Sequence, residues 1–497
     1  MKSALKVLVT MSFFILSILI IGTVEKLDNK GINFLENKKT EESNVAVNKD
    51  EEKYNLPLVV INTNGKRISE NEKINGTIKI YDNKDGVNYL SDIPQLESDI
   101  NIKIRGNTTR KLPKKQYSIE LVNKNGKEVK EEVLGMPKSS EWILNASFED
   151  KSLMRNYLAY NISRKIMSYA PRIKYCEVFL IDDNSKSLNK SNYKGVYMMV
   201  EKIDRDKNRV NISKTKKNLN TTSFIVLRNP NKDKDIILNN YGYDIYLYDY
   251  PEIIDYPKKN LTDEKKNYIN KEISEFERVL YSNKFNDPIE GYRKYIDVES
   301  FVDYYLINEF FRNTDAGIFS TYIHKDFNGK IKAGPVWDFD TSMGNNSVIS
   351  KYGDSTGLYM AQTAWFDRLL LDKTFVWQVL QRYKLLRKTY FSDQYLLNSI
   401  DDALKELGDA PKRNFQTWPI YMANQPEMFK NYKNDFTPYE HDINLLDEYL
   451  KSHPELLLPE DDRATSYEEE IKMLKKFIVD RGKWMDENID SLYKWAD

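Results

Sequence analysis

The 497-residue sequence predicts an α+β fold. A strand-rich part at about residues 55–201 precedes a mainly helical part at about residues 202–497, and an N-terminal membrane segment lies ahead of both. Three observations support this prediction. Short β-rich segments separated by turns fill the first part, apolar residues at helical spacing dominate the second, and a long uncharged apolar run lies near Met1. The length allows up to roughly three domains, or one large domain with insertions.

The N-terminal segment, residues 1–24, is predicted to be a signal anchor or a signal peptide. Residues 7–24 carry no charge, and a helix of that length reaches about 27 Å, close to the ~30 Å hydrocarbon core of a bilayer. This length favours a retained anchor, because the apolar part of a cleaved peptide usually has about 7 to 15 residues. Two lysines on the short N-terminal side place the remaining chain outside the cytoplasm. We therefore expect an extracytoplasmic domain, either membrane-anchored or secreted, behind a charged tether at 25–54.

The strand-rich part shows period-two alternation of apolar and polar residues. The segments LPLVVINT, TIKIYD, NIKIRG and QYSIEL, all between residues 56 and 121, predict antiparallel strands. A helix and two further strands are expected next, at 152–170, 175–181 and 193–200. This order predicts a small α+β lobe.

The part after Glu201 is predicted to be mainly helical. Asp297 is a plausible N-cap for one of its helices. Helical periodicity occurs at 265–281, 297–311, 366–389, 396–407 and 467–495.

Composition excludes several classes of function. Seventy-five Lys and Arg balance 75 Asp and Glu, so there is no net basic field, and no nucleic-acid partner is expected. A single cysteine, Cys176, rules out Cys-rich zinc sites and dithiol redox motifs. His324, His441 and His453 are far apart and fit no HExxH pattern. Carboxylates therefore remain as the candidate metal ligands.

Asp338 and Asp340 lie in GPVWDFDTSMGN, at 334–345. An apolar run that leads into Asp-Phe-Asp predicts a strand end followed by a tight loop, where carboxylates can converge on a hard cation. The alternative is a solvated surface pair, because D-x-D recurs by chance in a chain rich in Asp. The flanking aromatic residues and glycine favour the metal-binding interpretation.

Asp315 follows the predicted helix ESFVDYYLINEFF. It lies 338 − 315 = 23 residues before Asp338, a spacing that resembles that of catalytic and metal-binding aspartates in phosphotransferases. The alternative is an Asx turn that ends the helix.

The segment RGNTTRKLPKK, at 105–115, is basic and lies between two predicted strands. Five cations in eleven residues, with a glycine and hydroxyls, can coordinate phosphate oxygens. The alternative is a solvated hairpin tip. The sequence contains neither a dinucleotide fingerprint nor a P-loop.

Five separated motifs together resemble the spore-coat CotH family of atypical protein kinases. They are RGNTTRKLPKKQYSIEL, EDKSLMRNYLAYNI, YKGVYMMVEKID, DVESFVDYYLINEFFRNTDA and GPVWDFDTSMGN, and the resemblance runs from about residue 55 to the C-terminus. It implies an atypical protein-kinase-like fold of two lobes. It also implies transfer of the γ-phosphoryl of ATP, with Mg²⁺ or Mn²⁺, to Ser or Thr of an envelope or spore-coat protein.

The resemblance implies roles for individual residues. Asp338 is similar to the metal-binding aspartate of kinases, and Asp340 is its neighbour in metal binding. Asp315 is similar to the catalytic-loop aspartate. Lys115 is implied to contact the phosphates, with Arg105 nearby. Positive groups and a metal on the phosphates, with a carboxylate near the attacking hydroxyl, are what phosphoryl transfer requires.

Four further positions concern the implied nucleotide site. Glu201 ends a strand where the lobes should hinge around adenine, and Asp150 or Glu149 is implied to orient the phosphate-contacting lysine. Ser320 stands where many relatives have Asn, five residues after the catalytic aspartate. A hydroxyl is a poorer metal ligand than an amide carbonyl, which predicts a weaker second metal site and weak or lost activity.

Two other functions compete with phosphoryl transfer. GDSTG matches the G-x-S-x-G nucleophile elbow around Ser355, with His441 and His453 downstream as bases, but the polar SVISKY before it is a poor buried strand. A non-catalytic pseudokinase or a carbohydrate-binding surface protein is the second alternative. Thirty-four Tyr and seven Trp could supply stacking faces, although most aromatic residues lie at helical spacing typical of a core.

Overall fold

The computed structural model describes most of the chain after the predicted tether. The described residues are 52–106, 109–112, 114–183, 188, 190–232, 234–345, 354–418 and 464–496. The predicted membrane segment at 1–24 lies outside them. Within the described residues, no helix combines the length and the apolar content that a membrane crossing needs.

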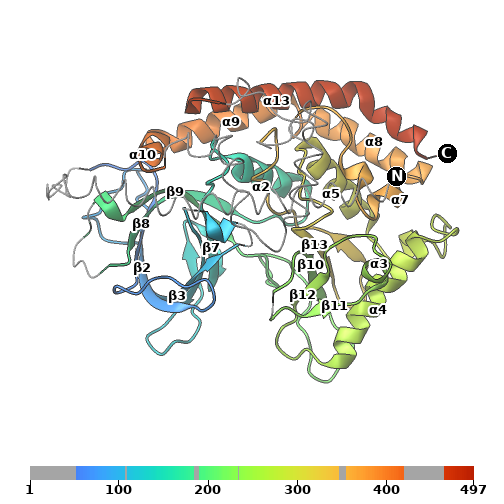
Figure 1. Ribbon diagram of the computed structural model, residues 1–497, viewed down its shortest axis with the longest axis horizontal. Helices are drawn as coiled ribbons and strands as arrows, with labels where there is room; N and C mark the ends of the chain where they lie inside the picture. The colour runs from blue at the N-terminus through green and yellow to red at the C-terminus, as the bar shows by residue number, and fades with distance from the viewer. Residues whose placement is uncertain are drawn as a thin grey trace, which may run out of the picture.

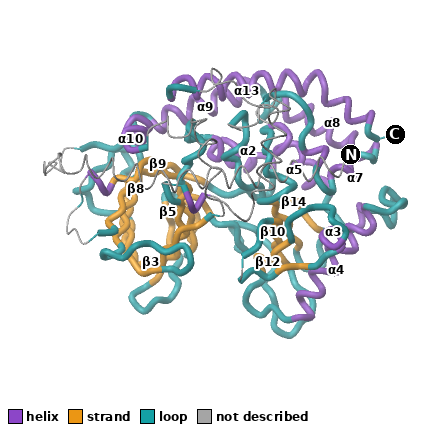
Figure 2. The backbone as a smooth tube through the Cα atoms, in the orientation of Figure 1, coloured by secondary structure: helices purple, strands orange, loops and turns teal. Residues whose placement is uncertain are grey.

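Seven strands of the N-terminal part close into a barrel (Figures 1 and 2). In spatial order they are β1 (Leu58–Asn62), β2 (Ile74–Tyr81), β3 (Leu96–Arg105), β4 (Gln116–Val122), β7 (Glu141–Asn145), β9 (Tyr193–Glu201) and β8 (Ile173–Ile181). Neighbouring strands are antiparallel except β1 and β8, which are parallel. The predicted antiparallel strands are therefore confirmed, while closure into a barrel was not predicted.

The interior of the barrel follows from the alternation in its strands. In β3 the side chains of Ile100 and Ile102 are buried inside, and Asn101 between them faces outward. Closure leaves no unpaired strand edge in the barrel itself. A short hairpin of β5 (Glu131–Val133) and β6 (Met136–Ser139) comes between β4 and β7 along the chain.

The C-terminal part is mainly helical in its described residues, as predicted, and it also contains a second sheet. In spatial order its strands are β11 (Ile237–Leu238), β12 (Glu252–Tyr256), β10 (Phe224–Arg228), β13 (Thr321–Lys325) and β14 (Ile331–Ala333). These strands have at most five residues each, and β10 is buried along nearly its whole length. A short strand buried on both faces shows no period-two pattern, so most strands of this sheet are hard to recognise in the sequence.

Most of the predicted helices are confirmed. The helices of the described residues are α2 (Arg155–Ile166), α3 (Tyr241–Asp244), α4 (Asp263–Leu280), α5 (Val298–Phe310), α7 (Phe366–Leu369), α8 (Lys373–Arg387), α9 (Asp393–Leu407), α10 (Ala410–Thr417) and α13 (Tyr467–Asn488). Of these, α3 and α10 were not predicted. Asp297 caps α5 as predicted, by accepting a hydrogen bond from Ser300 N. The single helix predicted at 366–389 is wrong, because Asp372 caps α8 through Thr374 N and separates it from α7.

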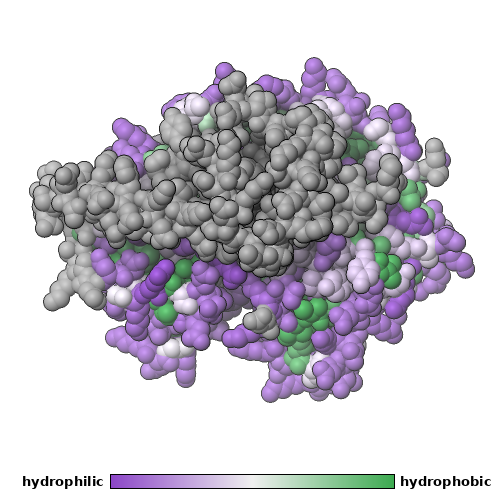
Figure 3. All heavy atoms as spheres, viewed as in Figure 1, coloured by the Kyte–Doolittle hydropathy of each residue, from purple (hydrophilic) through white to green (hydrophobic). Residues whose placement is uncertain are grey.

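The largest core lies where α2, α5, α8 and the C-terminal helices meet. Helix α5 is buried on nearly all sides, which is expected of an apolar central helix. Helices α9 and α13 contact each other and run along the top of the molecule in Figure 1, with the barrel at the left and the second sheet at the lower right. In Figure 3, the described part of the visible face is mainly hydrophilic with small apolar patches.

His324 on β13 gives a prediction about stability. Its Nδ1 lies 2.9 Å from Gly334 O, and burial lowers the pKa of the ring to about 4. An unfolded histidine titrates near 6.5, so the folded state binds fewer protons between about pH 6.5 and 4. The free energy of unfolding should therefore fall as the pH falls through this window. The loss should be at most about 3 kcal/mol, and less because the ring keeps some exposure.

Urea unfolding of the wild type and His324→Gln at pH 7 and pH 5 measures this effect. The wild type should lose more stability than the variant between the two pH values, since glutamine does not titrate. Equal losses would show that His324 contributes nothing to the pH dependence of stability.

Candidate functional site

Three loops bring four acidic side chains together. Glu149 lies between β7 and α2, Asp315 lies between α5 and β13, and Asp338 and Asp340 lie in the loop after β14. The charges of Asp338 and Glu149 raise the pKa of Asp315. The charges of Asp338, Glu149 and Asp315 raise the pKa of Asp340. The two motifs that the sequence singled out 23 residues apart therefore belong to one site.

The electrostatics of this acidic cluster, Glu149, Asp315, Asp338 and Asp340, suit a bound cation. Burial, followed by the charge of Asp338, raises the pKa of Asp315 and of Asp340 well above the usual range. The same two causes raise the pKa of Glu149 to about 7. Burial also raises the pKa of Asp338, against the hydrogen bond from Ser320 and the charge of Arg105. The repulsion among these carboxylates is what a hard divalent cation would relieve, so the residues fit such an ion.

Helix α2 holds the loop that carries Asp338 and Asp340. Asn156 Oδ1 accepts the N–H of Phe339 at 2.8 Å, and Asn156 Nδ2 donates to Asp340 Oδ1. Tyr160 Oη accepts the N–H of Asp338 at 3.1 Å. Asn156 and Tyr160 are four residues apart, so they lie on one helix face. Neither residue was predicted from the sequence, although two polar groups on the buried face of an amphipathic helix are a usable signal.

Left-handed backbone conformations surround the acidic cluster. Asp338, Ser320, Arg312 and Met343 have φ values of 63°, 52°, 50° and 49°. Each such residue costs about 1–2 kcal/mol outside glycine, and strain of this kind concentrates at functional sites. Ser320 Oγ donates to Asp338 Oδ2 at 3.1 Å, so two strained residues meet in one hydrogen bond. The loops are held in a specific geometry by their surroundings.

The turn that carries Asp315 is tied to the second sheet and to the Asp338 loop. Thr341 Oγ1 donates to Asp315 Oδ1 at 3.3 Å. Arg228 on β10 donates from Nη1 to Gly317 O at 2.9 Å, and its guanidinium is almost fully buried. These contacts place the Asp315 carboxylate beside the neighbouring loop.

Arg155 connects the N-terminus of α2 with the C-terminal helix. Its Nη1 lies 2.7 Å from Asp150 Oδ1 and 2.6 Å from Glu470 Oε1 on α13, and its Nη2 donates to Met343 O at 3.4 Å. Asp150 Oδ2 also accepts the N–H of Arg155 at 2.8 Å. The contacts of Asp150 are thus those of a residue that fixes the start of α2, and its implied role toward Lys115 stays a prediction.

Arg105 is the predicted phosphate-binding residue that the structure brings to the acidic cluster. Its guanidinium lies 5.5 Å from the ring centroid of Trp337, next to Asp338, and its charge lowers the pKa of Asp338. Lys115 Nζ donates one hydrogen bond to Arg110 O at 2.9 Å, within the basic segment itself. The role of Lys115 toward phosphates stays a prediction.

Glu201 ends β9, where the chain passes from the barrel toward the second sheet. Its carboxylate is fully buried and accepts from Arg172 Nη1 at 2.9 Å and 3.1 Å, and from Arg172 N at 2.9 Å. These contacts hold the end of the strand. Its implied place beside adenine stays a prediction.

The GDSTG segment has a structural explanation in its described residues. Arg481 on α13 donates from Nη1 to Ser355 O at 2.9 Å, and its Nη2 lies 2.6 Å from Glu309 Oε1 in a fully buried ion pair. The segment is therefore an anchor between α13 and α5. The two histidines proposed as bases, His441 and His453, lie outside the described residues.

The described residues hold no group of three His, Cys, Asp or Glu side chains that could by itself bind a metal ion. Mg²⁺ commonly takes one or two protein carboxylates and completes its shell with substrate phosphates and water. Asp338 and Asp340 could supply such a pair.

Comparison with known proteins gives one family. The family model described as CotH kinase protein matches residues 102–485, which is most of the chain and includes all four residues of the acidic cluster. No curated protein matches the chain.

Proposed function

The chain belongs to the CotH family, and from this premise we propose that it is an ATP- and divalent-metal-dependent protein phosphotransferase. The proposed acceptor is a Ser or Thr hydroxyl of an envelope or spore-coat protein. The proposed location is outside the cytoplasm, either held by the N-terminal segment or secreted. The two-lobed kinase-like arrangement belongs to this proposal too, with the barrel as the N-lobe.

The observation that carries the proposal is the convergence of the acidic cluster with Arg105. Phosphoryl transfer needs little covalent help from the protein. It needs positive charge on the transferred group and a carboxylate near the attacking hydroxyl. The charges of carboxylates from three loops act on one another here, and the guanidinium of Arg105 on the barrel acts on Asp338. That combination of charges is what a metal–phosphate complex requires.

Each residue then has a role in the transfer. A bound divalent cation would neutralise negative charge on the ATP phosphates, and Asp338 and Asp340 are the residues that would hold it. Arg105 adds a second positive charge for the phosphate oxygens. Asp315 orients the acceptor hydroxyl and takes its proton while that oxygen bonds to the γ-phosphorus and the bond to the β–γ bridging oxygen breaks, which releases ADP.

Transfer of radiolabelled γ-phosphate tests the proposal. The full-length protein is incubated with labelled ATP, Mg²⁺ or Mn²⁺ and a serine-rich acceptor mixture from the cell envelope. Label should enter protein only with a divalent cation, and a chelator should remove it. Metal-dependent nucleotide binding without transfer would instead favour the pseudokinase alternative.

Ser320→Asn gives a prediction about the weaker second metal site. Asn tolerates the left-handed conformation at this position better than most residues, so the substitution should fold. Its amide oxygen is a better metal ligand than the hydroxyl, so the variant should show a several-fold higher transfer rate at limiting Mn²⁺ if the second metal limits the rate.

Ser320→Gly is the matched control for this substitution, because glycine adopts the left-handed conformation of this position without strain. It removes the same hydrogen bond to Asp338 without adding a ligand. If both variants lose activity equally, the hydroxyl of Ser320 serves Asp338 and no second metal binds there.

A further inference from the structure

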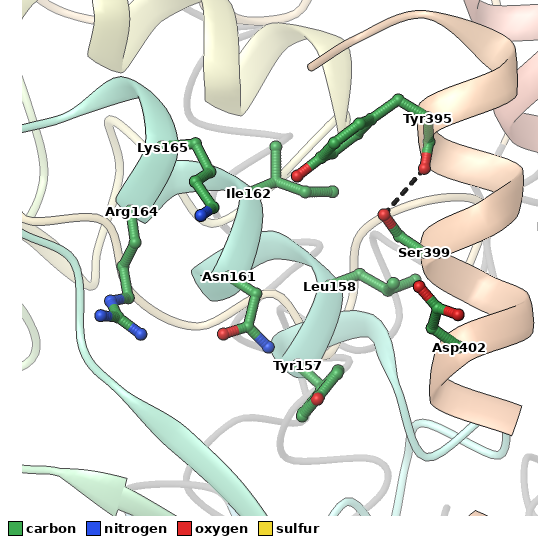
Figure 4. A pocket seen from close by; sticks show the side chains of 9 residues that line it. All are labelled: Tyr157, Leu158, Asn161, Ile162, Arg164, Lys165, Tyr395, Ser399 and Asp402. Carbon is green, nitrogen blue, oxygen red and sulfur yellow. Dashed lines mark hydrogen bonds between the residues drawn. The ribbon is translucent and has the colours of Figure 1, made fainter. Parts of the chain in front are cut away.

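A pocket of about 330 Å³ lies between α2 and α9, away from the acidic cluster (Figure 4). Tyr157, Asn161, Arg164 and Lys165 come from α2, and they alternate along the helix with Asn156 and Tyr160, which face the Asp338 loop. The pocket and the acidic cluster therefore use different residues of one helix. Its volume is at the small end of the range for ligand pockets, so it suits a single ring better than a nucleotide.

The charges in the pocket lack partners in the described part of the chain. Arg164 and Lys165 on α2 and Asp402 on α9 make no hydrogen bond or ion pair with any described residue. Glu201 is the acid whose charge acts on Arg164, and its carboxylate is already paired with Arg172. Two cations thus stand on one wall and one carboxylate stands on the other.

The remaining lining supplies amphipathic surface and hydrogen-bonding groups. The side chain of Tyr395 reaches from α9 toward Ile162 on α2 in Figure 4. The Tyr157 hydroxyl donates a hydrogen bond to Glu406 Oε2 at 2.6 Å, and the Tyr157 ring contributes to the wall of the pocket. Asn161 offers an amide between these groups. Tyrosine rings present an apolar face with a polar edge.

We infer that this pocket binds an anionic sugar, meaning a sugar ring that carries a phosphate or a carboxylate. The anionic substituent pairs with Arg164 and Lys165, where charge-assisted hydrogen bonds are strongest. Ring hydroxyls donate to the carboxylate of Asp402 and exchange hydrogen bonds with Asn161, and the C–H face of the ring lies on tyrosine. This inference does not rest on the proposed phosphotransferase function, because it concerns a separate pocket.

Calorimetric titration of the full-length protein, without nucleotide or metal, tests the inference. The probes are glucose 6-phosphate and glucuronate, with glucose as the neutral control. At least one anionic probe should bind at least about tenfold more tightly than glucose. Polygalacturonate is titrated as a further probe, since it carries carboxylated sugar rings on a polymer. Binding of the polymer identifies a surface polysaccharide as the source, and binding of the monomers alone identifies a soluble sugar.

Matched variants locate the binding. Arg164→Ala combined with Lys165→Ala should weaken binding of the anionic probe at least about tenfold, because both cations are removed. Both side chains are exposed, so the double variant should keep the fold, which circular dichroism checks. Lys405→Ala removes an exposed lysine of α9 outside the pocket and should change the affinity less than about twofold.

Three results would overturn the inference. The first is equal affinity for glucose and for both anionic probes. The second is an unchanged affinity in the folded double variant. The third is the absence of saturable binding of every probe at about 10 mM. Each of these measures binding alone, so a failure here leaves the phosphotransferase proposal standing, and the reverse also holds.

Discussion

Asp338→Asn should abolish both metal-dependent nucleotide binding and phosphoryl transfer. The charge of its carboxylate raises the pKa of each other member of the acidic cluster. Arg105 and Ser320 both stabilise the charged form of Asp338. An amide in the same place cannot neutralise a cation. We expect a loss of at least about 10³-fold in transfer rate, measured with labelled ATP, and loss of the Mg²⁺ dependence of nucleotide binding.

The choice of asparagine keeps this experiment interpretable. Asp338 has φ of 63°, a conformation that asparagine tolerates and that would strain alanine. Asp490→Asn, at an exposed position near the C-terminus, is the control for a change of one charge and should leave transfer unaltered. Normal transfer by Asp338→Asn would remove Asp338 from the site and, with it, the basis of the proposed function.

Asp315→Asn should separate transfer from nucleotide binding. The Asp315 carboxylate is proposed to act on the acceptor hydroxyl, so its loss should lower transfer by roughly 10²-fold or more, the usual scale for a positioned general base. Nucleotide affinity should change less than about twofold, measured by calorimetry with Mg²⁺ present.

Stability provides the control for Asp315→Asn. Burial and the charges of Asp338 and Glu149 raise the pKa of Asp315 well above that of an unfolded aspartate. The folded state therefore holds this proton more tightly, and ionisation of Asp315 at neutral pH costs stability. The variant should be at least as stable as the wild type at pH 7, so a lower unfolding midpoint would point to damage of the fold.

The two substitutions together assign the roles. If nucleotide binding is lost in Asp315→Asn and unaffected in Asp338→Asn, the roles of the two aspartates are exchanged. Absence of nucleotide binding by the wild type would favour the alternative of a non-catalytic binding protein. In that case the pocket between α2 and α9 becomes the first place to look for its ligand.

Local sequence determined the elements and the motifs. Period-two alternation predicted β1 to β4 of the barrel, while β7 was not predicted. Helical periodicity predicted α2, α5, α9 and α13, because spacing along the chain decides which side chains share a face. Asp338 and Asp340 were found by the apolar and aromatic residues around them, and Asp315 by its place after a predicted helix, 23 residues before Asp338.

Only the tertiary structure decided how these elements close and which side chains meet. Barrel closure and the short buried strands of the second sheet have no local pattern, since they depend on partners far along the chain. Arg155 pairs with Glu470, 315 residues away, and Asn156 reaches the Asp338 loop across more than 180 residues. A buried polar group must find a partner wherever the fold supplies one, and spacing in the sequence cannot show where that is.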